Sequence, residues 1–340
     1  MKTILITDTH VDENNIELVD SIFEQTISYC IENSVSVIFH LGDWFKSRKG
    51  QPQSVLSFTK NVFKKIGDNN IKLYIIPGNH DKSDLSSKES FLDSYSDYKN
   101  IHLIDTYDII DFDKLTLFFL PFFKEEVYLD YLKIISLEAS KSRNSYLFTH
   151  QALNGVKNND NSIVEGNIGT NLFNNFNQVF VGHYHNVQKY SNIYYIGSSH
   201  PVNFGEDNNK GIVLFDTESQ ETQRIKLNYP EYKKLEINIE ALTMSDINDL
   251  VKMKNDSDDN IRLIVKGKSE AINSFDRTLL QNNGIDVELK SDEVEKQMIK
   301  ADDDEYDIFT VDSIKEEFKN FCEEKNHNYD DGKVFLNYMQ

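Results

Sequence analysis

Three short apolar runs, rich in β-branched residues, alternate with two amphipathic patterns near the start of the chain. The runs cover residues 4–6, 35–41 and 72–76, and their composition is typical of buried strands. Apolar residues at helical spacing fill the two intervals, around residues 19–31 and 55–66. Because parallel strands need a crossover connection, this alternation predicts a parallel β-sheet covered by helices.

The middle of the chain adds more strand patterns and one more helix. We expect a helix near residues 125–139, and strands at residues 115–120, 146–149, 178–181, 193–196, 211–216 and 222–227. The chain contains 22 Phe and 17 Tyr, so we also expect an aromatic-rich core. Together these patterns predict one α/β domain over residues 1–230.

Composition changes near Pro230, and residues 231–290 predict a second, smaller α/β unit. Strand patterns at residues 261–266 and 285–289 flank a helix pattern at residues 271–281. We therefore expect a small domain to follow the main one.

From residue 291 the chain becomes acidic, with 15 Asp and Glu against 6 Lys up to residue 340. A capping-box pattern at residues 313–316 predicts the start of a helix. The apolar face of this helix would be formed by Ile314, Phe318 and Phe321. That face could pack on its own chain, but we favour a helix of a partner protein. Residues 291–340 are thus predicted to form an acidic linker and a partner-binding helix.

The formal net charge of −20 argues against a free-standing nucleic-acid binder, which needs a basic surface, without excluding DNA binding. No apolar run reaches 18 residues, so we expect no membrane span. The first residues turn polar too soon for a signal peptide. Cys30 and Cys322 lie in helix-like apolar patterns, which indicates buried thiols and no disulfide or zinc site. These features indicate a reducing, cytoplasmic compartment.

Polar residues suited to metal binding follow the predicted strands. They are Asp8, His10, Asp43, Asn79, His150, His183 and His185, with His80 beside them. Ligands gather at the carboxyl ends of parallel strands, so we expect these side chains to lie close together. Carboxylate and imidazole donors without cysteine suit Mn, Fe or Zn better than calcium or a structural zinc. Seven such residues are more than one ion needs, which predicts two ions.

Five motifs occur in order along the chain: Asp8-x-His10, Gly42-Asp43, Gly78-Asn79-His80-Asp81, His150 and Gly182-His183-x-His185. In order and spacing they resemble the motifs of the calcineurin-like metallophosphoesterases. The chain is similar to the SbcD-type nuclease subunits of DNA double-strand-break repair and recombination complexes, including phage ones. This similarity is carried by residues 41–45, 150–155, 195–201, 204–206 and 210–211. The resemblance implies a four-layer αββα sandwich, followed by a small α/β cap domain that faces DNA and a helical tail.

The resemblance also implies a role for each site residue. One divalent ion would be held by Asp8, His10 and His185, and the other by Asn79, His150 and His183. Asp43 would bridge the two ions, for which Mn²⁺ is expected ahead of Mg²⁺. His80 would contact the scissile phosphate and assist the leaving oxygen, and Asp81 would hold His80 in place.

The partners that this resemblance implies are DNA, an SbcC-type coiled-coil ATPase subunit and a second copy of the chain. The second copy would pack on the helices near residues 16–31 and 52–66. The implied activity is that of a two-metal DNA exonuclease or endonuclease. A small-substrate phosphoesterase and a non-catalytic scaffold of such a complex are the alternatives, since both would keep the same ligands.

Several residues have two interpretations. Lys46, Arg48 and Lys49 follow Asp43 closely and either contact DNA phosphates or form a solvated surface. His200 follows a Gly-Ser-Ser turn and is an equally open case, as a DNA contact or a structural residue. For His40, inside a strand pattern, we expect burial with one hydrogen bond.

Overall fold

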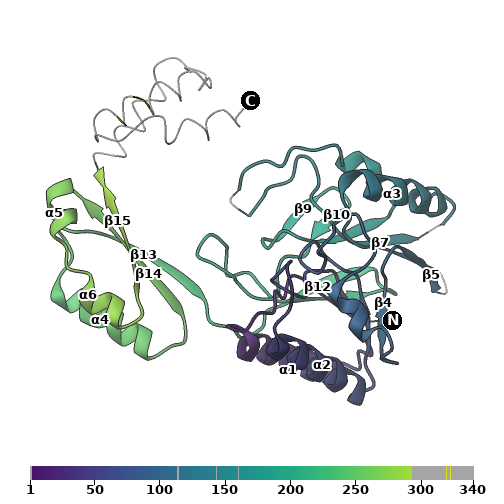
Figure 1. The fold of residues 1–340 in the computed structure, drawn as a ribbon, viewed down its shortest axis with the longest axis horizontal. Coiled ribbons are helices and arrows are strands. Elements are labelled where there is room, and N and C mark those ends of the chain that lie inside the picture. The colour runs from purple at the N-terminus through teal and green to yellow at the C-terminus, as the bar shows by residue number, and fades with distance from the viewer. Residues whose placement is uncertain are drawn as a thin grey trace.

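The computed structural model describes residues 2–112, 115–142, 144–159, 161–292, 319 and 322. Its main body contains two six-stranded sheets that lie face to face (Figure 1). The first sheet has the order β12 (Glu221–Ile225), β11 (Ile212–Asp216), β1 (Lys2–Ile6), β2 (Val37–His40), β3 (Lys72–Ile75) and β4 (Ile101–Leu103). The second has the order β5 (Asp108–Phe112), β6 (Leu115–Leu120), β7 (Ser145–His150), β8 (Gln178–Gly182), β10 (Ile193–Tyr195) and β9 (Gln188–Tyr190).

The centre of each sheet is parallel, as the alternation of patterns predicted. Strands β1 to β4 pair in parallel in the first sheet, with Ile4 opposite Ile38 and Ile38 opposite Leu73. Strands β6, β7, β8 and β10 do the same in the second sheet. The antiparallel pairs lie towards the edges, where β11, β12, β5 and β9 join. The carboxyl ends of the central strands therefore meet along one edge of each sheet.

Helices cover the outer faces and complete a four-layer sandwich, which confirms the predicted fold class. Helices α1 (Ile16–Glu32) and α2 (Gln53–Asp68) pack on the first sheet, and α3 (Glu125–Ala139) packs on the second. Figure 1 shows α1 and α2 on one side of the body and α3 on the other. Two short 3₁₀ helices, η1 (Phe91–Tyr95) and η2 (Thr170–Phe173), lie in connections. The last residue of the apolar spacing predicted over residues 19–31 is a correction: Ile31 is 57% exposed, whereas Cys30 is buried.

The layer between the two sheets is rich in aromatic rings, as the composition predicted. Phe39 of the first sheet meets Phe119 and Phe148 of the second edge-on, with ring centroids 5.0 and 4.8 Å apart. Phe148 in turn stacks on Phe180 at 5.3 Å. Such ring pairs contribute beyond the apolar area that they bury. This interlocked layer holds the two sheets in register, so that strand ends from both sheets face one another.

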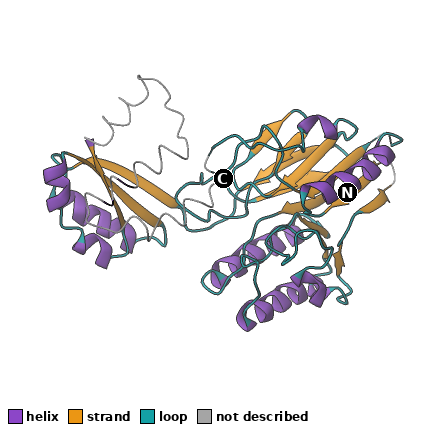
Figure 2. Ribbon diagram, turned by 45° about the horizontal axis from the view of Figure 1, so that its top comes forward, coloured by secondary structure: helices purple, strands orange, loops and turns teal. Residues whose placement is uncertain are grey.

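A separate small unit follows the main body. Its parallel sheet has the order β13 (Tyr232–Asn238), β14 (Asn260–Gly267) and β15 (Asp286–Ser291), with helices α4 (Met244–Asn255), α5 (Ser269–Ser274) and α6 (Thr278–Asn282). Figure 2 shows these helices gathered on one face of the sheet, where they form a core of their own. The single helix predicted over residues 271–281 is two helices, since the Asp276 carboxylate accepts from Thr278 N and starts a new one.

The structure leaves parts of the sequence-based predictions untested. The acidic linker and the proposed partner-binding face, Ile314, Phe318 and Phe321, lie outside the described residues. Whether residues 231–290 fold as an independent domain also stays a prediction. None of the helices in the described part of the chain combines the length and the apolar character that a membrane crossing requires.

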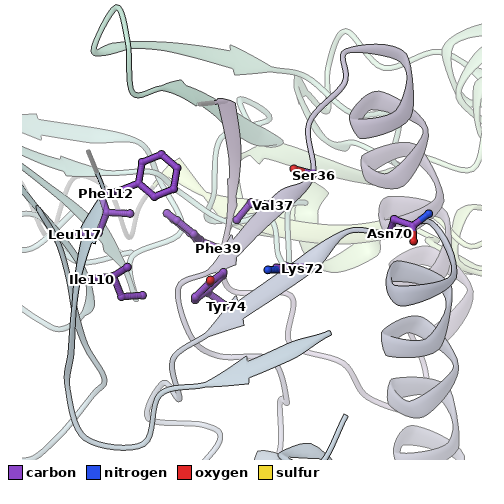
Figure 3. Close-up of a pocket in the computed structure, with 9 residues that line it drawn as sticks. All are labelled: Ser36, Val37, Phe39, Asn70, Lys72, Tyr74, Ile110, Phe112 and Leu117. Atoms are coloured by element: carbon purple, nitrogen blue, oxygen red, sulfur yellow. The ribbon is translucent and has the colours of Figure 1, made fainter. Parts of the chain in front are cut away.

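An apolar cavity of about 340 Å³ opens between the sheets near the amino-terminal ends of β2 and β3 (Figure 3). Its walls are Ser36, Val37, Phe39, Asn70, Lys72, Tyr74, Ile110, Phe112 and Leu117. These residues include no carboxylate and no imidazole, so the cavity has no set of metal ligands.

Candidate metal centre

The predicted ligands come from five strands and meet at one edge of the sandwich. Asp8 and His10 follow β1, Asp43 follows β2 and Asn79 follows β3. His150 is the last residue of β7, and His183 and His185 follow β8. All seven have little exposed surface or are fully buried, because the two sheets and their connections enclose this edge.

The seven side chains divide into two groups that share Asp43. In the first group, His10 Nε2 lies 3.1 Å from His185 Nε2 and 3.7 Å from Asp8 Oδ1. In the second, Asn79 Oδ1 lies 2.8 Å from His183 Nδ1 and 3.2 Å from His150 Nε2.

Asp43 lies between the groups. Its Oδ2 is 3.7 Å from His10 Nε2 and 3.4 Å from His150 Nε2. The structure thus brings together the two ligand sets and the shared carboxylate that the resemblance implies.

Each carboxylate uses one oxygen for the scaffold and turns the other to the centre. Asp8 Oδ2 accepts from Thr7 Oγ1 at 2.8 Å and from His183 N at 3.0 Å. Asp43 Oδ1 accepts from His80 N at 2.8 Å. The remaining oxygens, Asp8 Oδ1 and Asp43 Oδ2, face the imidazole nitrogens, and Asp8 Oδ1 is buried without a hydrogen-bond partner among the described residues.

Two of the imidazoles are oriented in the same way. His150 Nδ1 lies 2.6 Å from Leu41 O, and His185 Nδ1 lies 2.8 Å from Glu206 Oε1. A carbonyl or carboxylate oxygen can only accept, so both Nδ1 atoms donate and both Nε2 atoms face the centre. Lone pairs that converge from Asp8, Asp43, His150 and His185 repel one another unless protons or metal cations lie between them. The donor set therefore fits the divalent ions that the sequence predicted.

The pKa directions agree with a site built for positive charge. Burial lowers the pKa of His183 to about 3, with His150 nearby adding to the shift, so this imidazole is neutral and able to ligate. Burial opposes protonation of His150, but the Asp43 carboxylate raises its pKa to about 9. Burial also opposes ionisation of Asp43, yet His150 and His10 lower its pKa well below the usual range. A bound cation would take over the role of the His150 proton.

The backbone at these ligands is strained. Asp8, His10, Asp43 and His183 have positive φ angles of 52°, 44°, 56° and 91°. Side chains other than glycine rarely adopt such angles, and the residues that do so cluster at functional sites. Four of the seven predicted ligands have a positive φ, which supports a functional role for this edge of the sandwich.

Glycine is required where these loops approach one another. Gly42 has a φ of 91°, and a Cβ there would lie 2.5 Å from His150 Nδ1. A Cβ on Gly78 would lie 2.2 Å from Asp43 Oδ1. The glycines of the Gly-Asp and Gly-Asn-His-Asp motifs thus allow the ligand loops to touch.

Asp81 has a different role from the predicted one, which is a correction. Its buried carboxylate accepts from Phe45 N at 2.9 Å, Trp44 N at 3.2 Å and Gly78 N at 2.8 Å. These bonds join the loop after β2 to the loop after β3, and so set Asp43 against Asn79. The His80 ring is instead held by the Lys46 carbonyl, which lies 2.5 Å from Nδ1. Asp81 is too deeply enclosed by backbone amides to orient His80.

Three basic residues follow Asp43, and they differ in position. Arg48 Nη2 lies 3.1 Å from His80 Nε2 and is at the rim of the site cavity, as is Lys46. Lys46 also forms an ion pair with Asp12. Lys49 is exposed. Only Arg48 and Lys46 of these three line the cavity, which has a volume of about 330 Å³.

Two further histidines are structural. His200 is 2% exposed and its Nδ1 lies 3.0 Å from Ser199 Oγ, so the interpretation as a DNA contact is corrected: a buried ring cannot reach DNA. His40 is fully buried with its Nε2 3.2 Å from Thr9 Oγ1, which matches the structural interpretation.

Glu206 and Lys210 were among the residues that carry the resemblance, but neither they nor Asn159 were assigned a role. Glu206 bonds to His185, Lys210 forms an ion pair with Glu206, and Asn159 Oδ1 accepts from His185 N at 2.8 Å. Glu206 and Lys210 follow the Gly-Ser-Ser-His-Pro turn closely, which is a signal for proximity but not for contact.

Comparison with known proteins agrees with this geometry. The family model described as calcineurin-like phosphoesterase matches residues 1–215. Exonuclease subunit 1 of Enterobacteria phage T4 is 25% identical over 215 residues, covering 62% of each chain. The putative phosphoesterase 244L of Invertebrate iridescent virus 6 is 25% identical over 284 residues, covering 81% of this chain and 96% of the viral protein.

A third relative is the DNA double-strand break repair protein Mre11 of Methanocaldococcus jannaschii. It is 30% identical over 166 residues, covering 45% of this chain and 44% of the archaeal protein. The chain thus spans 62% of the phage relative and less than half of the archaeal one. Proteins of the matched family use divalent metal ions, and the buried His and Asp cluster provides ligands for them. Because its model matches more than half of the residues, the chain belongs to the calcineurin-like phosphoesterase family.

Proposed function

We propose that the chain is a two-metal phosphodiesterase that cuts DNA and serves as the nuclease subunit of an ATPase-linked repair or recombination complex. The observation that carries this proposal is the pair of ligand groups sharing Asp43, with His80 and Arg48 beside them. Two relatives carry names that point the same way, an exonuclease subunit and a DNA double-strand break repair protein.

The metal position near Asp8 would use His10 and His185, and the other would use Asn79, His150 and His183. Two ions bound there would polarise a phosphoryl oxygen and lower the pKa of a bound water. The mixture of carboxylate, amide and imidazole ligands favours Mn²⁺, with Mg²⁺ as the second choice.

His80 and Arg48 are placed to handle the phosphate. Arginine can only donate, so His80 Nε2 accepts from Arg48, while Nδ1 donates to Lys46 O. His80 is therefore held as the neutral tautomer with its lone pair directed to the rim. A phosphodiester entering the cavity would draw the Arg48 guanidinium to its oxygens and leave the His80 Nε2 lone pair free to accept a proton, which Nε2 would then donate to the leaving oxygen.

The partners follow from the same proposal. An SbcC-type coiled-coil ATPase would supply the basic surface that a chain of net charge −20 lacks. A second copy would pack on α1 and α2. The complex would work in the cytoplasm, that of the host if the chain comes from a phage.

A small-substrate phosphoesterase is the second candidate function. It is favoured by the viral relative named as a putative phosphoesterase, whose alignment covers 81% of this chain. A non-catalytic scaffold is less well supported, since the full ligand set and His80 are present.

The test is Mn²⁺-dependent cleavage of a labelled linear DNA and of a generic phosphodiester by the wild type and His80→Ser. We expect cleavage of DNA to fall by about 10²–10⁴-fold in the variant, with bound metal unchanged. Turnover of the small ester alone, even with the ATPase partner added, would favour the second candidate. No turnover of either compound with two ions bound would favour the scaffold.

A further inference from the structure

Glu206 is a buried carboxylate that belongs to neither predicted ligand group. Its Oε1 lies 2.8 Å from His185 Nδ1, and its Oε2 lies 3.2 Å from Lys210 Nζ. The Glu206 and Lys210 side chains are 1% and 0% exposed. A buried ion pair is seldom more stabilising than apolar residues of the same volume. Its presence beside a predicted metal ligand therefore suggests a role in orientation.

The same pair holds both the ring and the backbone of His185. Because the Glu206 carboxylate can only accept, it turns His185 Nε2 towards Asp8 and His10. Lys210 Nζ donates to His185 O at 2.6 Å and to Asn186 Oδ1 at 2.9 Å. Loss of Glu206 would thus free the ring and leave the Lys210 ammonium with only the more distant Asp207 carboxylate, 4.0 Å away.

The loop that carries Glu206, residues 202–209, also contacts the small C-terminal unit. Asn208 exchanges two hydrogen bonds of 3.1 Å with the backbone of Tyr232, the first residue of β13. The Phe204 ring meets the Tyr232 ring edge-on at 4.8 Å and lies under the Arg262 guanidinium of β14 at 4.3 Å. One short loop therefore links the small unit to a predicted metal ligand.

We propose that Glu206 is a positioning residue for the metal position formed by Asp8, His10 and His185, and that the contacts of residues 202–209 with the small unit set the affinity of this position. The inference rests on the proposed two-metal site but not on the cleavage of DNA. A ligand that shifts the small unit against this loop would change the metal affinity of this position and leave the other unchanged.

The first experiment is a Mn²⁺ titration of the full chain, followed by calorimetry and by electron paramagnetic resonance, for Glu206→Ala and Glu206→Gln. We expect Glu206→Ala to weaken the binding of one of the two Mn²⁺ ions by roughly 10–100-fold. Glu206→Gln should recover much of the affinity, because its amide oxygen can still accept from His185 Nδ1. The second ion should bind as in the wild type.

The second experiment titrates Phe204→Ala and Asn208→Ala. Each should weaken binding of the same ion by about two- to fivefold. Phe204→Ala removes the cation–π contact with Arg262, and Asn208→Ala removes the two hydrogen bonds to the Tyr232 backbone. Lys189→Ala is the matched control, since it removes another cation–π contact, in which Lys189 Nζ lies 4.4 Å from the centre of the Tyr194 ring. The control should titrate as the wild type.

Wild-type affinity for both ions in a folded Glu206→Ala protein would overturn the positioning role, and so would equal weakening of both. Unchanged titrations of Phe204→Ala and Asn208→Ala would overturn the link to the small unit. If Glu206→Ala fails to fold, a full loss of the ion in the near-isosteric Glu206→Gln would contradict the role of an oxygen that accepts from His185, and the loop variants still test the link to the small unit. Normal titrations with no cleavage of DNA would count against the proposed function instead.

Discussion

The two ends of the sandwich hold cavities of nearly equal volume and opposite chemistry. The cavity at the carboxyl ends of the strands measures about 330 Å³ and is lined mainly by polar groups: four imidazoles, three asparagine amides, one carboxylate and two basic side chains. The cavity at the other end measures about 340 Å³ and is lined mainly by aliphatic and aromatic side chains (Figure 3). The volume of a cavity therefore does not identify the functional site. The site is identified by the oxygen and nitrogen ligand atoms that converge on one of the two cavities.

The backbone at the two ends differs in the same sense. At the metal edge, Asp8, His10, Asp43 and His183 are held at positive φ. At the apolar end, Asn70 alone among the residues lining the cavity has a positive φ. Strain is thus concentrated where function is proposed, and substitutions at the two ends should have different consequences.

The largest effect is expected from Asp43→Ala. This change removes the carboxylate shared by both groups, so we expect metal content and phosphodiester hydrolysis to fall together, the latter by about a thousandfold or more. Elemental analysis and turnover of a generic phosphodiester measure the two quantities. Full activity with one ion bound would show that a shared carboxylate is unnecessary.

A substitution at the apolar end should act on stability alone. Leu117 is 2% exposed and lines the apolar cavity, so Leu117→Ala should lower the free energy of unfolding by about 2–5 kcal/mol. Denaturant titration measures this loss. The number of Mn²⁺ ions bound per folded molecule should not change; if it does, the two ends are coupled through the aromatic layer.

Gly42→Ala should affect both stability and the metal site. Its φ of 91° and the contact of a new Cβ with His150 predict a loss of about 1–3 kcal/mol, together with weaker Mn²⁺ binding. Gly50→Ala is the matched control, because a Cβ there meets nothing within 4 Å, and it should stay within about 0.5 kcal/mol of the wild type. Thermal melts and metal titrations of the pair decide whether the strained backbone matters.

The smallest effect is expected at the rim of the metal edge. Arg48 bonds to His80 and lines the cavity, so Arg48→Ala should reduce phosphodiester turnover by roughly tenfold or more. Lys49→Ala, an exposed neighbour that does not line the cavity, should change it less than about twofold. If steady-state kinetics show the same loss of turnover in both variants, the site responds to the net charge of this segment and not to the contact between Arg48 and His80.

The sequence predicted residues whose position depends on the local pattern. Asp8, Asp43 and Asn79 follow apolar runs directly, so strand direction alone brings them to one edge. The parallel order and the helices that cover the sheets follow from the same periodicity. Resemblance then assigned these residues to two ligand groups, and the structure brings the members of each group together.

Contacts between distant segments were harder to predict. Asp81 was assigned to His80, its sequence neighbour, but its oxygens bond to Trp44 and Phe45, which lie more than thirty positions earlier. His200 was left open because no pattern shows how deeply the turn at residues 197–201 is buried. Glu206 was noted as part of the resemblance, but its contact with His185 was not predicted, because this contact depends on the path of a loop.

By itself, then, the sequence determined most of the strands and helices of the main body and predicted the list of ligands, because periodicity and strand-end positions are local properties of the chain. It did not predict the short strands β4, β5 and β9, nor β13 and α4 of the small unit. The tertiary structure decided which oxygen of each carboxylate faces the centre, which nitrogen of each imidazole is free, and which groups hold them in place. Those choices depend on hydrogen bonds from residues far away in the chain, such as Leu41 to His150 and Glu206 to His185. Only the folded arrangement of two sheets and one loop places these partners within reach.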